Sequence, residues 1–275
     1  MLTNILTLAN YELAASLRNR WFVLYTLIFA LLATALSTLS LSGAGTFGFA
    51  GFGRTAASLI NLVLLIVPLM GLTIGAQSLA GEREQGTLAY LLAQPVSRAE
   101  VLLGKLFGLG ASLMAALLLG FGLAAAIIAW QGGGVEAGRY GFLVLFSLLL
   151  ALASLSLGLA LSAWSRSAAL AAGLALFAWL VLVFLGDLGL MGTAVVMRID
   201  IDALFTLALL NPLQVFKIAA VYGLRASLEV LGPAGLYATR AYGDALVPML
   251  AGVLALWTVV FLGVAYVRFR MEGDF

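Results

Sequence analysis

Glu82, Arg83, Glu84 and Arg98 flank a short apolar segment in one charged island of an otherwise hydrophobic chain. The island runs from Gly81 to Lys105, between two stretches that are each long enough to cross a bilayer. Charges around an apolar surface suit binding to another protein, because apolar burial supplies affinity and rim charges fix orientation. We therefore expect a docking site for a soluble partner. Its expected residues are Glu82, Arg83, Glu84, Gly86, Thr87, Leu88, Leu91, Leu92 and Arg98.

A short helix is expected to carry the apolar surface of this island. Gly86 interrupts the preceding helix, and Thr87 can cap a new helix of about two turns. Leu88, Leu91 and Leu92 follow the i, i+3, i+4 spacing that places side chains on one helix face. The hypothesis is that these leucines insert into a groove of the partner while the charges align around them.

The next helix should begin at Ser97. Pro95 prevents the preceding helix from continuing into this one. Ser97, with Glu100 three residues later, forms the pattern of a capping box. The segment 81–98 is therefore predicted to be a loop with a short helix inside it, joining two long helices.

Catalysis by the chain itself is not expected. The sequence has no cysteine and no histidine, which excludes disulfides, thiolate or imidazole metal ligands and a histidine acid or base. No paired carboxylates, nucleophile with a base, or phosphate-binding loop are present either. The net charge of only +2 gives no indication of nucleic-acid binding. We expect no catalytic residue, no metal ligand and no cofactor bound by this chain.

Composition places the chain in a membrane. It is 64% hydrophobic and 9% charged, whereas about 25% of residues are charged in a typical soluble domain. The expected fold is a single all-α transmembrane domain over residues 1–275, with six transmembrane helices, an N-terminal interfacial helix at 1–20 and a helical extracytoplasmic segment between the fifth and sixth spans. The six expected spans are Trp21 to Leu41, Thr55 to Ala80, Leu106 to Trp130, Tyr140 to Ser165, Ser167 to Gly186 and Ala245 to Val267.

The spans are uncharged, which argues against a proton-coupled pump or an ion channel. Their orientation follows from the positive-inside rule, which favours both termini in the cytoplasm. The short outer loops would then hold only Arg54 and Arg139. The cytoplasmic set would be Arg18, Arg20, Arg83, Arg98, Lys105, Arg166, Arg268 and Arg270.

The segment from Met1 to Asn19 has apolar residues at helical spacing and ends in basic residues, which is typical of an amphipathic helix at the membrane surface. A cytosolic extension is the alternative. Small residues recur within the spans, at Gly71 and Gly75 and again at Gly104 and Gly108. Such rows let helices approach closely, so we expect them to serve packing within or between subunits.

The long outer segment, residues 187–244, is expected to form helices on the outer surface that present a platform. The alternative is a simple connector. Lys217, Arg225 and Glu229 are its expected contacts with an extracytoplasmic partner. Met191 and Met197 are a weak indication of a Cu(I) site, because scattered methionines usually fill gaps between helices.

The island and the topology together resemble the permease subunit of type-2 ABC exporters. The pattern is ERExGTLxxLLxxPVSRxExxxGK, read from Glu82 to Lys105. The resemblance implies a homodimer in the bacterial inner membrane, bound to two cytoplasmic ATPase subunits that hold ATP and Mg²⁺. It also implies that the island is a coupling loop, which takes up the motion of the ATPase.

Within this family the outer segment resembles the membrane subunit of the transporter that helps to mature the copper enzyme nitrous oxide reductase. The resemblance rests on 211–217 and 227–236. It implies a periplasmic copper-binding partner that carries the copper and docks on the platform. A conventional exporter for a lipid, drug or other small substrate remains the alternative, and a passive membrane anchor is a third, weaker interpretation.

Overall fold

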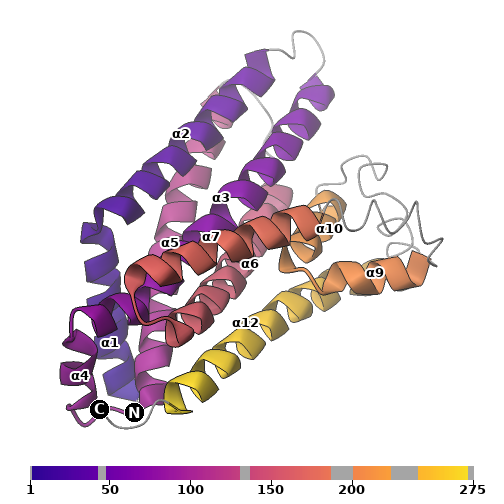
Figure 1. Cartoon of the computed structure of the whole chain (residues 1–275). Coiled ribbons are helices and arrows are strands. Elements are labelled where there is room, and N and C mark those ends of the chain that lie inside the picture. The colour runs from indigo at the N-terminus through magenta and orange to yellow at the C-terminus, as the bar shows by residue number, and fades with distance from the viewer. Residues whose placement is uncertain (1, 43–47, 131–136, 187–200, 224–240, 272–275) are drawn as a thin grey trace.

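The computed structural model of the chain is a bundle of helices (Figure 1). It describes residues 2–42, 48–130, 137–186, 201–223 and 241–271, and within these ranges it contains no strand, so the expected all-α class is confirmed there. The helices are α1 (Leu2–Arg18), α2 (Arg20–Ser42), α3 (Gly48–Glu84), α4 (Thr87–Leu92), α5 (Arg98–Trp130), α6 (Ala137–Trp164), α7 (Ala168–Phe184), α9 (Ile201–Leu209), α10 (Pro212–Gly223) and α12 (Leu246–Met271), the last preceded by a short 3-10 turn at Gly243–Ala245.

Five helices, α2, α3, α5, α6 and α12, are long and apolar enough to cross a membrane. They coincide with five of the expected spans. The remaining expected span, Ser167 to Gly186, corresponds to α7, which has 17 residues and is therefore about 25 Å long at 1.5 Å per residue. This length lies at the lower end of what crosses a bilayer. A tight turn joins α6 and α7, and the Ser167 hydroxyl caps α7 by accepting from the Leu170 N–H.

The core of the bundle forms where α3 crosses α6, and glycines make the close approach possible. A Cβ atom on Gly75 would lie 2.5 Å from the Leu155 carbonyl oxygen, and one on Gly158 would lie 2.5 Å from the Leu72 carbonyl oxygen. The prediction that Gly71 and Gly75 serve helix packing is therefore confirmed, and the packing is within one chain.

Helices α1 and α2 follow α5 in the same direction. Near the start of α5, Gly104 lies against Leu8, and Gly108 lies against the backbone of Ala9. Further along, Gly120 lies against the ring of Phe29 in α2. The glycine row of α5 thus also serves packing. One face of α1 contacts α5, while Leu2 and Leu6 on another face are exposed; the position of α1 at the membrane surface stays a prediction.

The outer segment differs from the expected surface platform. Helices α9 and α10 form a pair bent by 113° at Asn211, and α10 packs into the bundle against α3, α6 and α12. Most of α10 is buried, including Val215, Phe216 and Ala219. Helix α10 covers 212–223 of this segment, and its apolar side chains pack in the core. Residues 187–200 and 224–240, with Met191, Met197, Arg225 and Glu229, lie outside the described residues.

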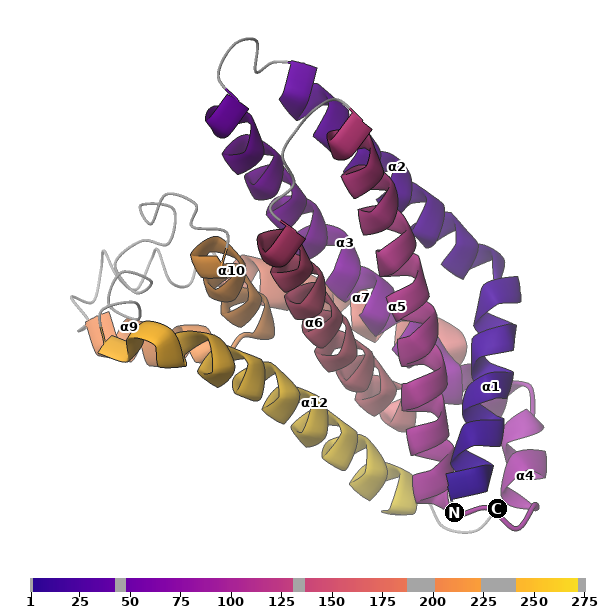
Figure 2. The same cartoon turned by 180° about the vertical axis from the view of Figure 1, so that it is seen from behind.

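The short helix α4 marks one end of the bundle. The first turn of α1 and the last turn of α12 lie at this same end (Figures 1 and 2). The Asn4 side chain reaches toward the Pro95 carbonyl, and the Arg98 guanidinium reaches the Phe269 carbonyl. The helices α9 and α10 lie far from α4. Both ends of the described chain are therefore on the side of the predicted coupling loop.

Candidate functional site

The loop between α3 and α5 has the backbone that its sequence predicts. Helix α3 ends at Glu84. Gly86 has a positive φ of 75°, a backbone conformation that is strained for any residue with a side chain. The capping box is confirmed: the Ser97 N–H donates to Glu100 Oε2 at 2.8 Å, and the Glu100 N–H donates to Ser97 Oγ at 3.2 Å. The cap of α4 differs, because Gly86 is its N-cap residue and the Thr87 hydroxyl donates back to the Glu82 carbonyl.

The leucines of α4 do share one face, but that face packs on the chain itself. Leu88 is only 2% exposed and belongs to the main core, and Leu91 and Leu92 are partly buried against it. The expectation that Leu88 inserts into a partner is therefore corrected. The opposite face of α4 is available instead, and there Tyr90 is 79% exposed.

Glu82 joins a buried ionic cluster at the start of the loop. Lys105 of α5 is 1% exposed, and its Nζ donates to Glu12 of α1 at 2.5 Å and to Glu82 at 2.6 Å. One lysine thus holds two carboxylates that come from different helices. Buried ions are tolerated when they are paired, since the attraction offsets the loss of hydration. This cluster fastens the end of α3 to both α1 and α5.

Arg83 and Glu84 fasten the loop to the hairpin of α6 and α7. The Arg83 guanidinium donates to the carbonyl oxygens of Ser162 and Ser165, where α6 ends. The Glu84 carboxylate accepts from the Ala168 N–H at 2.8 Å, where α7 begins. Both side chains bind helix ends, which leave backbone groups without partners inside their own helix.

Arg98 fastens the far end of the loop to α12. Its guanidinium donates to the Phe269 and Arg270 carbonyls, each at 2.8 Å, and lies 5.7 Å from the centre of the Phe269 ring. A cation at a helix C-terminus interacts favourably with the carbonyl ends and with the helix dipole. The loop is therefore held to the last turn of α12.

These contacts change the role expected for the charges. They do not only surround α4; each one anchors the loop to a different part of the bundle. The loop is consequently a junction between α1, α5, α6, α7 and α12. The sequence-based interpretation missed the ionic pair of Glu12 and Lys105. The available signal was that Glu12 is the sole acidic residue before the first span and Lys105 directly precedes an apolar run.

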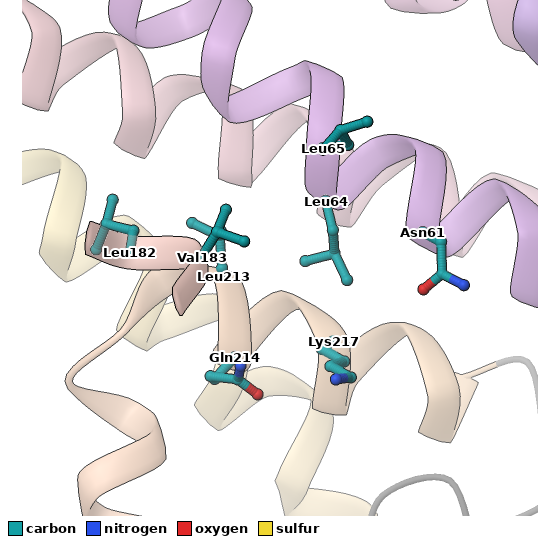
Figure 3. Close-up of a pocket in the computed structure, with 8 residues that line it drawn as sticks. All are labelled: Asn61, Leu64, Leu65, Leu182, Val183, Leu213, Gln214 and Lys217. Carbon is teal, nitrogen blue, oxygen red and sulfur yellow. The ribbon is translucent and has the colours of Figure 1, made fainter. Parts of the chain in front are cut away.

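Lys217 lies on α10, at the other end of the bundle (Figure 1). It is half-buried and lines a pocket between α3, α7 and α10 (Figure 3). Among the described residues there is no group of three or more His, Cys, Asp or Glu side chains that could hold a metal ion.

Known proteins are similar to this chain over nearly its whole length. Residues 6–273 match the model of the ABC-2 family transporter proteins. The chain is 34% identical to the probable ABC transporter permease protein NosY of Stutzerimonas stutzeri, over 98% of this chain and 99% of that protein. It is 35% identical to the probable ABC transporter permease protein NosY of Pseudomonas aeruginosa, over 96% of this chain and 97% of that protein. The chain therefore belongs to the ABC-2 family of transporter proteins, as a NosY-like membrane permease subunit.

Proposed function

We propose that this permease subunit couples ATP hydrolysis by a separate cytoplasmic ATPase to a periplasmic copper-handling partner during the maturation of nitrous oxide reductase. Two copies of the permease and two ATPase subunits would form the complex in the bacterial inner membrane. ATP and Mg²⁺ would be held by the ATPase and copper by the periplasmic partner. The similarity to NosY over nearly the whole chain supports this choice among the functions of ABC permeases.

The junction at α4 is the observation that carries the proposal. A force applied to α4 reaches α1 and α5 through Glu82, and reaches the α6–α7 hairpin through Arg83 and Glu84. It reaches α12 through Arg98. Packed helices with discrete hydrogen bonds transmit displacement over such distances when the structure has two arrangements. A motion of the ATPase would thus move several helix ends together.

Helix α10 provides the corresponding contact at the other end. It packs against α3, α6 and α12. Arg83 binds the end of α6 and Arg98 binds the end of α12, while α3 leads directly into the coupling loop. Displacement of these helices would shift α10 and the segments beside it in the chain. Lys217 lies on α10 itself, and Arg225 and Glu229 follow it; these three residues are the proposed contacts with the periplasmic partner.

Purification of the complex from its native membrane tests this proposal most directly. We expect the tagged permease, extracted at low detergent, to retain an ATPase and a periplasmic protein that contains copper. Mass spectrometry identifies the proteins, and elemental analysis measures the copper. An ATPase without the periplasmic protein would favour the conventional exporter instead. Absence of any ATPase would contradict both interpretations.

The exposed face of α4 yields a sharper prediction. Tyr90→Asp should weaken association with the ATPase about thirtyfold, because an exposed aromatic side chain at an interface commonly contributes about 2 kcal/mol. The thermal midpoint of the isolated permease should not change, since Tyr90 is 79% exposed. Binding of the purified ATPase to permease in detergent measures the effect.

Tyr11→Asp is the matched control for this experiment. Tyr11 is also exposed, at 67%, but it lies on α1 rather than on α4. Leu88→Asp should behave differently from both, because Leu88 is buried and its replacement should destabilise the permease itself. If Tyr90→Asp and Tyr11→Asp bound the ATPase equally well, α4 would not present its exposed face to the ATPase.

A further inference from the structure

The pocket between α3, α7 and α10 has a polar and an apolar part. Asn61, Gln214 and Lys217 contribute polar groups, and the remaining lining is aliphatic (Figure 3). Figure 3 shows Asn61 and Lys217 toward one end of the pocket, and Leu182 and Val183 toward the other. Lys217 carries the only formal charge among the eight lining residues, and it is positive. The lining therefore favours an anionic group attached to an apolar body.

Hydrogen bonds between the surrounding helices fix the walls of the pocket. The Asn211 side chain donates to the Leu182 carbonyl at 2.6 Å, and its oxygen accepts from the Leu213 N–H at 2.9 Å. The Trp179 indole donates to the Leu65 carbonyl at 3.1 Å. These bonds tie the end of α7 to α10 and to α3. The pocket is thus formed before any ligand binds, which lowers the cost of binding.

The position of the pocket indicates where its ligand comes from. The uncharged stretch of α3 begins after Arg54, so Asn61 lies about 10 Å, roughly two helical turns, inside that end. This end is opposite to α4. The adjoining helix faces are apolar and exposed: Leu65 is 50% exposed, and Phe184 and Leu185 are also exposed. In a bilayer such faces contact lipid, so the pocket lies beside the headgroup level of one leaflet.

The size of the pocket limits what it can hold. Its volume is about 180 Å³, which is smaller than the ~300–1,000 Å³ of most small-molecule sites. A headgroup phosphate with part of its glycerol fits a pocket of this volume, whereas a whole lipid does not. The acyl chains would remain outside, along the exposed faces of α3 and α7.

We propose that this pocket binds the headgroup of an anionic phospholipid, with the phosphate at Lys217, Gln214 and Asn61 and the acyl chains along α3 and α7. The attraction between the phosphate and the ammonium group is stronger than in bulk water, because Lys217 is half-buried. The ligand would hold α3, α7 and α10 together. Lys217 is also one of the three residues proposed above to contact the periplasmic partner, so the test uses the permease alone and measures lipid binding directly.

Native mass spectrometry of the full-length permease, stripped of lipid in detergent, tests the proposal. We expect phosphatidylglycerol to bind at least tenfold more tightly than phosphatidylcholine, and Lys217→Gln to remove most of this preference. Arg20→Gln is the matched control, because Arg20 is an exposed basic residue at the start of α2 that does not line the pocket. It should leave the preference unchanged.

A second variant guards against misfolding. Asn61 is exposed at the rim of the pocket, so Asn61→Trp should obstruct the pocket while leaving the fold intact, and phosphatidylglycerol binding should again fall about tenfold. Thermal midpoints of all variants check folding. Equal binding of phosphatidylglycerol to the wild type, Lys217→Gln and Asn61→Trp would overturn the proposal. Full competition by millimolar inorganic phosphate would also overturn it, since the site would then take a free anion rather than a lipid.

Discussion

Lys105→Met should destabilise the permease more than any other single charge removal in the described chain. The ammonium group of Lys105 is buried and holds the Glu12 and Glu82 carboxylates at 2.5 and 2.6 Å. Methionine has a similar length but no charge, so two carboxylates would remain close together without a cation. Removing one partner from a buried ion pair typically costs about 3–5 kcal/mol. We expect a large fall in the thermal midpoint of the purified permease in detergent.

Two further variants distinguish the loss of charge balance from the loss of packing. In the triple variant Glu12→Gln, Glu82→Gln and Lys105→Met, no charge remains in this cluster, and most of the lost stability should return. Arg20→Met removes a cation from an exposed position and should have little effect. A midpoint for Lys105→Met equal to that of Arg20→Met would show that the cluster does not hold α1, α3 and α5 together.

The same variants bear on coupling. In the triple variant the loop keeps its contacts to α6, α7 and α12 but loses its charged link to α1 and α5. If the permease then folds and binds the ATPase, yet no longer stimulates ATP hydrolysis, the ionic cluster acts as a mechanical link. This result would separate the role of the cluster in coupling from its role in stability.

The long helices could be predicted from the sequence because their signal is local. Uncharged runs of about twenty residues leave few alternatives to a membrane helix, and five of them appear as such. The capping box at Ser97 and Glu100 was equally predictable, since both partners lie within one helical turn. The glycines of α3 were interpreted correctly for the same reason: a row of small residues on one face has few uses in a membrane other than close packing.

The partners of the charged residues could not be predicted, because they depend on contacts between distant segments. Glu12 and Lys105 are 93 positions apart, and nothing in either local sequence names the other. The spacing of Leu88, Leu91 and Leu92 predicted an apolar face correctly. An apolar face, however, does not reveal whether it packs on its own chain or on a partner. The structure decides this question for Leu88, which is 2% exposed.

Helix α10 shows a second limit of interpretation from sequence. The sequence-based interpretation placed Lys217 on a helix at the outer surface. In the structure, Asn211 caps α10 and donates to the Leu182 carbonyl, so the bend at this point directs α10 into the bundle. A break that ends one helix can therefore also aim the next one inward, where its aliphatic side chains are buried.

Gly75→Leu should separate α3 from α6 and thereby disturb both the core and the coupling loop. A Cβ atom at residue 75 would lie 2.5 Å from the Leu155 carbonyl oxygen and 3.0 Å from the Leu159 N–H nitrogen. These are backbone atoms inside a helix, so they cannot rotate away as a side chain would. Overpacking of this kind costs about 1–3 kcal/mol or more, and we expect a value of about 3 kcal/mol because the whole helix must move.

Gly252→Leu provides the matched control, because in the described structure no atom lies within 4 Å of a Cβ built on this glycine of α12. There, leucine should be neutral or slightly stabilising, since it favours the helix by several tenths of a kcal/mol over glycine. Thermal unfolding in detergent compares the two variants. The displacement of α3 should also weaken the hold of Arg83 on the Ser162 and Ser165 carbonyls, since Arg83 is two helical turns further along α3. Gly75→Leu should therefore reduce stimulation of the ATPase more than its binding, whereas equal midpoints for the two leucine variants would contradict the close contact of α3 and α6.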